Sequence, residues 1–94
     1  MKKTIYVMSG RKNKEDTTSI IMLNGATYGI KEVLKEQGYQ FDGETSLWYK
    51  RVENSKEELA NITVIGNNSN IEVKPLRMRE YPNLAALEAF MDRI

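Results

Sequence analysis

The side chains of this 94-residue chain best suited to binding chemistry are basic and aromatic. Lysine and arginine contact the phosphates of a nucleic acid, and an exposed aromatic ring stacks on its bases. The candidate nucleic-acid-binding residues are Lys31, Lys35, Tyr49, Lys50, Arg51, Arg77 and Arg79. Tyr49 is the candidate stacking ring, and the six basic residues are the candidate phosphate contacts.

Catalytic chemistry has fewer candidates. The chain contains no cysteine and no histidine, which excludes disulfides, thiolate chemistry and the usual general base. Ser9 and Lys12 match the pattern Ser-x-x-Lys, but they lie in a charged loop without the partner motifs of such enzymes. No phosphate-binding GxxxxGK[ST] segment is present. We therefore predict a protein that is not an enzyme, with no catalytic residue, no metal site and no cofactor.

The net charge and the hydropathy of the chain limit which classes of binding partner are expected. The chain carries 14 basic and 13 acidic residues, a net charge of +1, whereas nucleic-acid-binding domains usually show a clear basic excess. Solvated surface is therefore a competing interpretation of the basic residues. The apolar run Ile5 to Met8 is too short for a signal peptide, and no run reaches the length of a membrane span. These features predict a cytoplasmic protein without a membrane partner.

The first half of the chain predicts a strand pair followed by a helix. Residues 3–8 alternate in polarity, and residues 19–23 form a β-branched apolar run that ends in an Asn-Gly turn. Thr27 is positioned to cap a helix that ends at Gln37, and Gly38 follows where a left-handed residue is expected. The residues of this helix expected to face the core are Ile30, Val33 and Leu34.

An aromatic hairpin is expected next. Residues 39–41 and 47–50 are rich in aromatic side chains and flank a polar turn with the sequence DGETS. Alternation places Tyr39, Phe41 and Trp48 on one face, which we assign to the core, and Leu47 and Tyr49 on the other. This assignment makes Tyr49 the ring most available to a ligand.

The second half predicts a helix, a strand and a helix. Ser55 and Glu58 form a capping box, and the helix is expected to run to about Gly66, with a strand over residues 61–66 as the alternative. Residues 71–79 suggest a strand in which Pro75 requires an edge position. Asn83 caps a final helix with the apolar stripe Leu84, Leu87, Met91 and Ile94. The predicted fold is a single α+β domain over residues 1–94: a small sheet with an N-terminal strand pair, a helix, an aromatic hairpin, then helix-strand-helix.

The segment TYGIKEVLKEQGYQFDGETSLWYK, residues 27–50, resembles a small module found in phage and plasmid DNA-processing proteins, and distantly the HARP domain of annealing helicases. The matching residues are Thr27, Ile30, Lys31, Leu34, Lys35, Gly38, Tyr39, Phe41, Asp42 and Trp48. We place the HARP-like core at residues 19–52. The resemblance implies engagement of single-stranded or forked nucleic acid.

Two functional classes therefore remain open. The first is a non-catalytic module that binds single-stranded or forked DNA or RNA. The second is a protein of phage or mobile-element type that binds a host protein, such as an anti-CRISPR inhibitor of a defence enzyme. Clustering of the six basic residues would favour the first class, and a mixed surface would favour the second.

Overall fold

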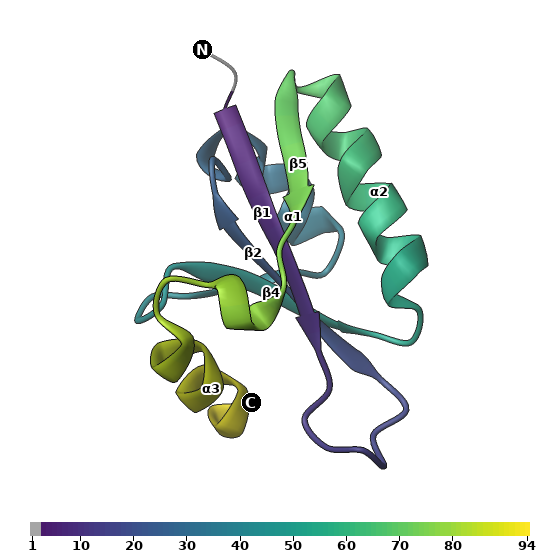
Figure 1. The fold of residues 1–94 in the computed structure, drawn as a ribbon. Coiled ribbons are helices and arrows are strands. Elements are labelled where there is room, and N and C mark those ends of the chain that lie inside the picture. Colours follow the sequence, from purple (N-terminus) through teal and green to yellow (C-terminus); the bar gives the residue numbers. More distant parts are fainter. Residues whose placement is uncertain (1–2) are drawn as a thin grey trace.

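The computed structural model describes residues 3–94 and contains a five-stranded mixed sheet (Figure 1). The strands are β1 (Lys3–Gly10), β2 (Ser19–Gly25), β3 (Gln40–Asp42), β4 (Leu47–Val52) and β5 (Ile71–Pro75). Their order across the sheet is β3-β4-β2-β1-β5. The pairs β1–β2, β2–β4 and β3–β4 are antiparallel, and β5 runs parallel to β1.

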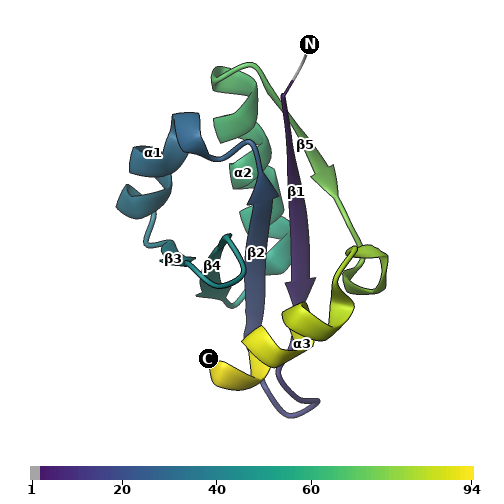
Figure 2. The same ribbon diagram turned by 90° about the vertical axis from the view of Figure 1, so that its left-hand side faces the viewer.

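Three helices cover the two faces of this sheet. They are α1 (Lys31–Glu36), α2 (Ser55–Asn68) and α3 (Leu84–Arg93), with short 3₁₀ turns at Tyr28–Ile30 (η1) and Met78–Glu80 (η2). Figure 2 shows α1 and α2 on one side of the strands and α3 across the other side. The predicted α+β class and the predicted order of elements are confirmed.

Two hydrophobic clusters lie on opposite faces of the sheet. The cluster under α1 and α2 contains Ile5, Val7, Ile21, Leu23, Ile30, Leu34, Tyr39, Trp48, Ile62 and Ile71. The cluster under α3 contains Met8, Ile20, Met22, Leu47, Leu87, Phe90 and Met91. Because successive side chains of a strand point to opposite faces, the central strands β1 and β2 supply both clusters.

Helix α1 departs from the prediction at its start and confirms it at its end. Thr27 makes no side-chain capping hydrogen bond, and the first turn is the 3₁₀ turn η1. Gly38 has φ of 92°, and the Tyr39 N–H donates to the Leu34 carbonyl at 2.9 Å, which closes the helix as expected. Val33, predicted to be buried, is 37% exposed.

The aromatic hairpin forms, but one of its rings is not in the core. Phe41 pairs with Trp48 in register, and Trp48 is buried as predicted. Phe41 is 52% exposed, so its assignment to the core was wrong. The reason is that β3 is a three-residue strand at the edge of the sheet, where fewer elements cover it.

Helix α2 resolves the ambiguity over residues 61–66 in favour of helix, because it continues to Asn68. Its N-cap is Asn54, whose side chain accepts a hydrogen bond from the Glu57 N–H at 3.1 Å, and the predicted cap at Ser55 is wrong by one residue. Gly66 allows close packing on β5, because a Cβ there would lie 2.9 Å from the Ile71 carbonyl oxygen.

The strand predicted over residues 71–79 is shorter than expected. It ends at Pro75, which occupies an edge strand as predicted, and the chain then turns through η2. The helix cap at Asn83 is confirmed by its hydrogen bond from the Ala86 N–H. Phe90, absent from the predicted apolar stripe, is fully buried in the α3 cluster.

Candidate nucleic-acid interface

A hollow of about 450 Å³ lies between η1, α1 and the β3–β4 hairpin. We call it the aromatic hollow. It is lined by Gly25, Thr27, Tyr28, Lys31, Lys35, Phe41, Ser46 and Trp48. It therefore combines aromatic rings with two of the seven predicted site residues.

The rings of the hollow include two that solvent reaches. Tyr28 is 80% exposed and Phe41 is 52% exposed. The Phe41 ring rests on Trp48, with ring centroids 5.1 Å apart and planes tilted by 50°. Trp48 itself is buried in the cluster under α1 and α2. The Trp48 contact supports Phe41 from below and leaves part of its ring open to a ligand.

The local fold explains why Tyr28 is exposed. Ile30 and Leu34 point into the core and fix the orientation of η1 and α1. Tyr28 lies two residues before Ile30, on the opposite side of the turn, and so faces solvent. The exposure of Tyr28 could have been predicted from the sequence, because the apolar positions of the predicted helix already defined its outer face.

Two lysines of α1 accompany these rings. The Lys31 Nζ lies 4.3 Å from the centroid of the Tyr28 ring, a cation–π arrangement. Lys35, one turn further along, lies 3.7 Å from a Glu32 carboxylate oxygen, and both side chains are largely exposed. An exposed ion pair of this kind is weak, so the Lys35 ammonium remains available to a phosphate.

Tyr49 does not belong to the hollow. It points to the opposite face of the sheet, where its ring packs edge-on against Phe90 with centroids 5.1 Å apart. Its hydroxyl donates to the Gln40 side-chain oxygen at 2.8 Å. Tyr49 is half-buried and lines a different hollow, together with Lys50 and Arg51. Its role as a stacking ring stays a prediction, and the rings of Tyr28 and Phe41 are the more exposed ones.

Lys50 and Arg51 each lie beside an acidic residue. The Lys50 Nζ lies 3.8 Å from Glu58 of α2, and this carboxylate also accepts a hydrogen bond from the buried Tyr39 hydroxyl at 3.0 Å. Burial, together with this carboxylate, raises the pKa of Tyr39 well above its usual range. The Tyr39 hydroxyl thus acts as a permanent donor that orients Glu58 toward Lys50.

Arg51 points to the other face, where its guanidinium lies 2.9 Å from Asp16. Hydrogen bonds from the Thr18 N–H and hydroxyl, assisted by Arg51, lower the pKa of Asp16. Asp16 therefore stays ionised and holds Arg51 against the β1–β2 loop.

Arg77 and Arg79 lie in the segment between β5 and α3, and both are exposed. This segment is at the β5 edge of the sheet, whereas the aromatic hollow is at the β3 edge. The structure thus divides the six predicted basic residues among three places. Lys31 and Lys35 line the aromatic hollow, Arg77 and Arg79 lie in the segment after β5, and Lys50 and Arg51 line another hollow together with Tyr49. Phe41 and Tyr28 were not among the predicted site residues.

Within residues 3–94, no helix combines the length and apolar character needed to cross a membrane. The same part of the chain holds no group of three or more acidic side chains arranged for a metal ion.

No family model, no curated protein and no solved structure gives a significant match to this chain. The HARP-like resemblance therefore stays a prediction that rests on the quoted residues alone.

Proposed function

We propose that this protein is a non-catalytic module that binds single-stranded nucleic acid in the aromatic hollow. The observation that carries the proposal is the arrangement of two exposed rings, Tyr28 and Phe41, beside the ammonium groups of Lys31 and Lys35. Unpaired bases stack on aromatic side chains, and lysines contact the phosphates that link them. A base inside a duplex has no free face for such stacking, so this site suits a single strand or the open arm of a fork.

The proposal also predicts how binding depends on salt. With two lysines at the hollow rather than six, the proposal predicts about two phosphate contacts. For a single strand, the logarithm of the affinity should then fall with the logarithm of the salt concentration with a slope of about −1.4. This shallow slope is consistent with the near-neutral net charge of the chain.

Fluorescence anisotropy with a labelled oligothymidylate at several salt concentrations tests the proposal. The double variant Lys31→Gln/Lys35→Gln should lose most of the salt dependence and most of the affinity. The matched control is Arg77→Gln/Arg79→Gln, which removes the same charge at the opposite edge of the sheet and should leave the slope unchanged. Equal weakening by both pairs would mean that net charge, not the hollow, governs binding.

The stacking contribution is tested separately with Tyr28→Ala and Phe41→Ala. Each should weaken binding by about 1–3 kcal/mol and leave the salt slope unchanged, because stacking releases no counterions. Absence of binding by the wild type at about 50 mM salt and micromolar protein would overturn the proposal, because phosphate contacts are strongest at low salt.

A second candidate function is supported by the ion pairs outside the hollow. Lys50, Arg51, Lys74 and Arg93 each lie within 4.0 Å of an acidic side chain, which makes much of the surface mixed rather than basic. A mixed surface with exposed aromatic anchors is typical of a protein-binding site. Under this candidate, the chain inhibits a host enzyme, as anti-CRISPR proteins do. Retention of a host protein by the wild type and its loss with Tyr28→Ala/Phe41→Ala, without nucleic-acid binding, would favour it.

A further inference from the structure

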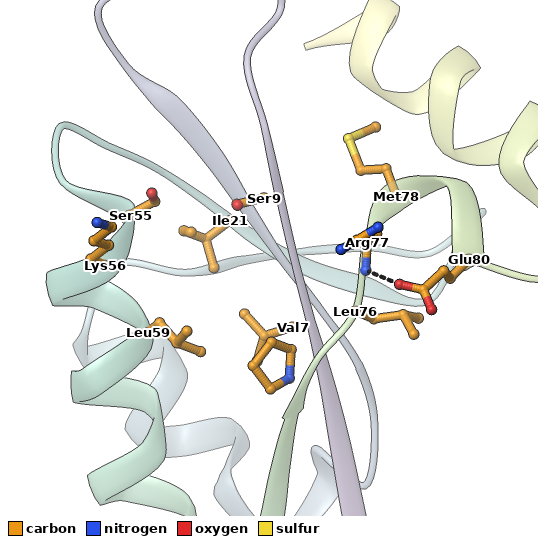
Figure 3. A pocket seen from close by; sticks show the side chains of 11 residues that line it. Val7, Ser9, Ile21, Ser55, Lys56, Leu59, Leu76, Arg77, Met78 and Glu80 are labelled. Carbon is orange, nitrogen blue, oxygen red and sulfur yellow. Dashed lines mark hydrogen bonds between the residues drawn. The ribbon is translucent and has the colours of Figure 1, made fainter.

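A second hollow, of about 590 Å³, lies between the first turns of α2 and the segment that follows β5 (Figure 3). Its apolar part is formed by Val7, Ile21, Leu59, Pro75, Leu76 and Met78. Its polar part is formed by Ser9, Ser55, Lys56, Arg77 and Glu80. It shares no lining residue with the aromatic hollow. We call it the edge hollow.

Strand β1 presents unpaired backbone to this hollow. The ladder between β1 and β5 ends where the Leu76 N–H donates to the Val7 carbonyl at 2.8 Å. Beyond this bond, β1 continues to Gly10 and pairs only with β2. Because backbone groups two residues apart point the same way, the Ser9 N–H and carbonyl face the side that β5 has vacated. They have no strand partner on that side within residues 3–94.

Two cations stand beside this open edge. Lys56 extends from α2 on one side, and Arg77 extends from the segment after β5 on the other (Figure 3). Neither side chain forms an ion pair with any residue that the structure describes. The one acidic residue of the hollow, Glu80, accepts a hydrogen bond from the Arg77 N–H at 3.0 Å. The edge hollow therefore carries a net positive charge above an apolar floor.

We propose that the edge hollow binds the C-terminal residue of a peptide whose last side chain is a branched apolar one. Arg77 and Lys56 hold the terminal carboxylate, and the floor of Val7, Ile21 and Leu59 takes the side chain. The Ser9 carbonyl accepts a hydrogen bond from the N–H of the last residue, and the Ser9 N–H donates to its carboxylate, as in the addition of a strand to a sheet edge. The open edge is only three residues long, Met8–Gly10, so it accommodates a chain end better than a passing strand.

The volume of the hollow agrees with a ligand of this kind. Ligand pockets commonly enclose about 300–1,000 Å³, with an apolar lining and a few convergent polar groups. Lys56 and Arg77 stand on opposite sides of the hollow, so a carboxylate bound over its floor lies between two positive charges. This inference is independent of the proposed nucleic-acid site, because it uses different residues at the other edge of the sheet.

Titration of isotope-labelled protein with N-acetyl-leucine, followed by amide NMR spectra, tests the proposal. Saturable shifts should appear at Ser9 and its neighbours in the edge hollow. Arg77→Gln and Lys56→Gln should each weaken binding by roughly tenfold, because each removes a charge-assisted contact. Arg79→Gln is the matched control, since Arg79 is an exposed arginine outside the lining, and it should bind as the wild type does. Unchanged spectral dispersion confirms that each variant is folded.

Two further ligands test separately the contributions of the carboxylate and of the amide to binding. N-Acetyl-leucinamide lacks the carboxylate and should bind much more weakly than N-acetyl-leucine. 4-Methylpentanoate keeps the carboxylate and the branched chain but lacks the amide that Ser9 would pair with, so it should also bind more weakly. Absence of saturable shifts, indifference to Arg77→Gln and Lys56→Gln, or equal binding of 4-methylpentanoate would each overturn the proposal.

Discussion

Phe41 and Trp48 show how the burial of a single residue depends on its position in the sheet. They face each other across the β3–β4 hairpin, yet Phe41 is 52% exposed and Trp48 is 7% exposed. The alternation of the hairpin predicted their shared face correctly. It did not predict their burial, because alternation does not indicate which strand lies at the edge. The exposed ring therefore became visible only in the structure.

This difference predicts unequal costs of truncation. Trp48→Ala removes a ring packed in the cluster with Ile30 and Leu34 and should lower the free energy of unfolding by about 3–5 kcal/mol. Phe41→Ala removes a half-exposed ring whose contact with Trp48 is worth about 1 kcal/mol, and should cost much less. Urea denaturation of both variants measures the difference. Similar midpoints would show that the hairpin ring and the core ring are equally buried.

At the scale of the elements, the helix caps show which sequence patterns predicted a helix end correctly. Asn83 and Gly38 were predicted from spacing and are confirmed, whereas Thr27 and Ser55 were not caps. A side chain caps a helix only from a residue whose own backbone is still extended. Asn54 has φ of −124° and ψ of 99° and satisfies this condition. Thr27 already has helical angles and makes no capping hydrogen bond to the N–H groups that follow it.

Gly38 gives a prediction at the scale of the helix. Its φ is 92°, and a Cβ added there would meet only the Lys50 side chain at 3.8 Å. The space is sufficient, so the cost of a substitution is conformational. Gly38→Val should destabilise the protein by more than about 1 kcal/mol, and Gly38→Asn by less, because asparagine tolerates this region. Thermal denaturation measures both.

The control for this prediction is Gly43→Val. Gly43 also has open space around it but does not have a positive φ. Equal losses at Gly38 for valine and asparagine would contradict the conformational explanation.

At the scale of the whole molecule, the order of elements was predictable and the neighbours in the sheet were not. β5 lies beside β1 because the chain crosses the sheet through α2, and no local pattern encodes that pairing. The same limit applies to the candidate site. Lys31 and Lys35 remain together because they lie one turn apart on α1. Lys50 and Arg51, adjacent in a strand, point to opposite faces of the sheet, yet their long side chains reach one hollow, which they line together with Tyr49. Alternation alone would not have predicted that shared position.

One set of contacts joins the hairpin to the C-terminal helix and predicts a dependence of stability on pH. Asp42 accepts hydrogen bonds from the Thr45 hydroxyl and N–H, and Arg93 of α3 lies 3.3 Å away. These contacts, with the Thr45 hydroxyl first and Arg93 next, lower the pKa of Asp42. The ionised carboxylate is therefore favoured in the folded protein relative to the unfolded chain.

A lowered pKa in the folded state contributes stability above the unfolded pKa of about 3.9, and this contribution is lost as the pH falls through the folded value. Thermal denaturation at several pH values should therefore show wild type more stable than Asp42→Asn at pH 7, with a gap that narrows below about pH 4. Arg93→Gln should keep part of this pH dependence, because the Thr45 contacts remain. A gap between wild type and Asp42→Asn that does not change with pH would show that the Asp42 charge does not connect the hairpin to α3.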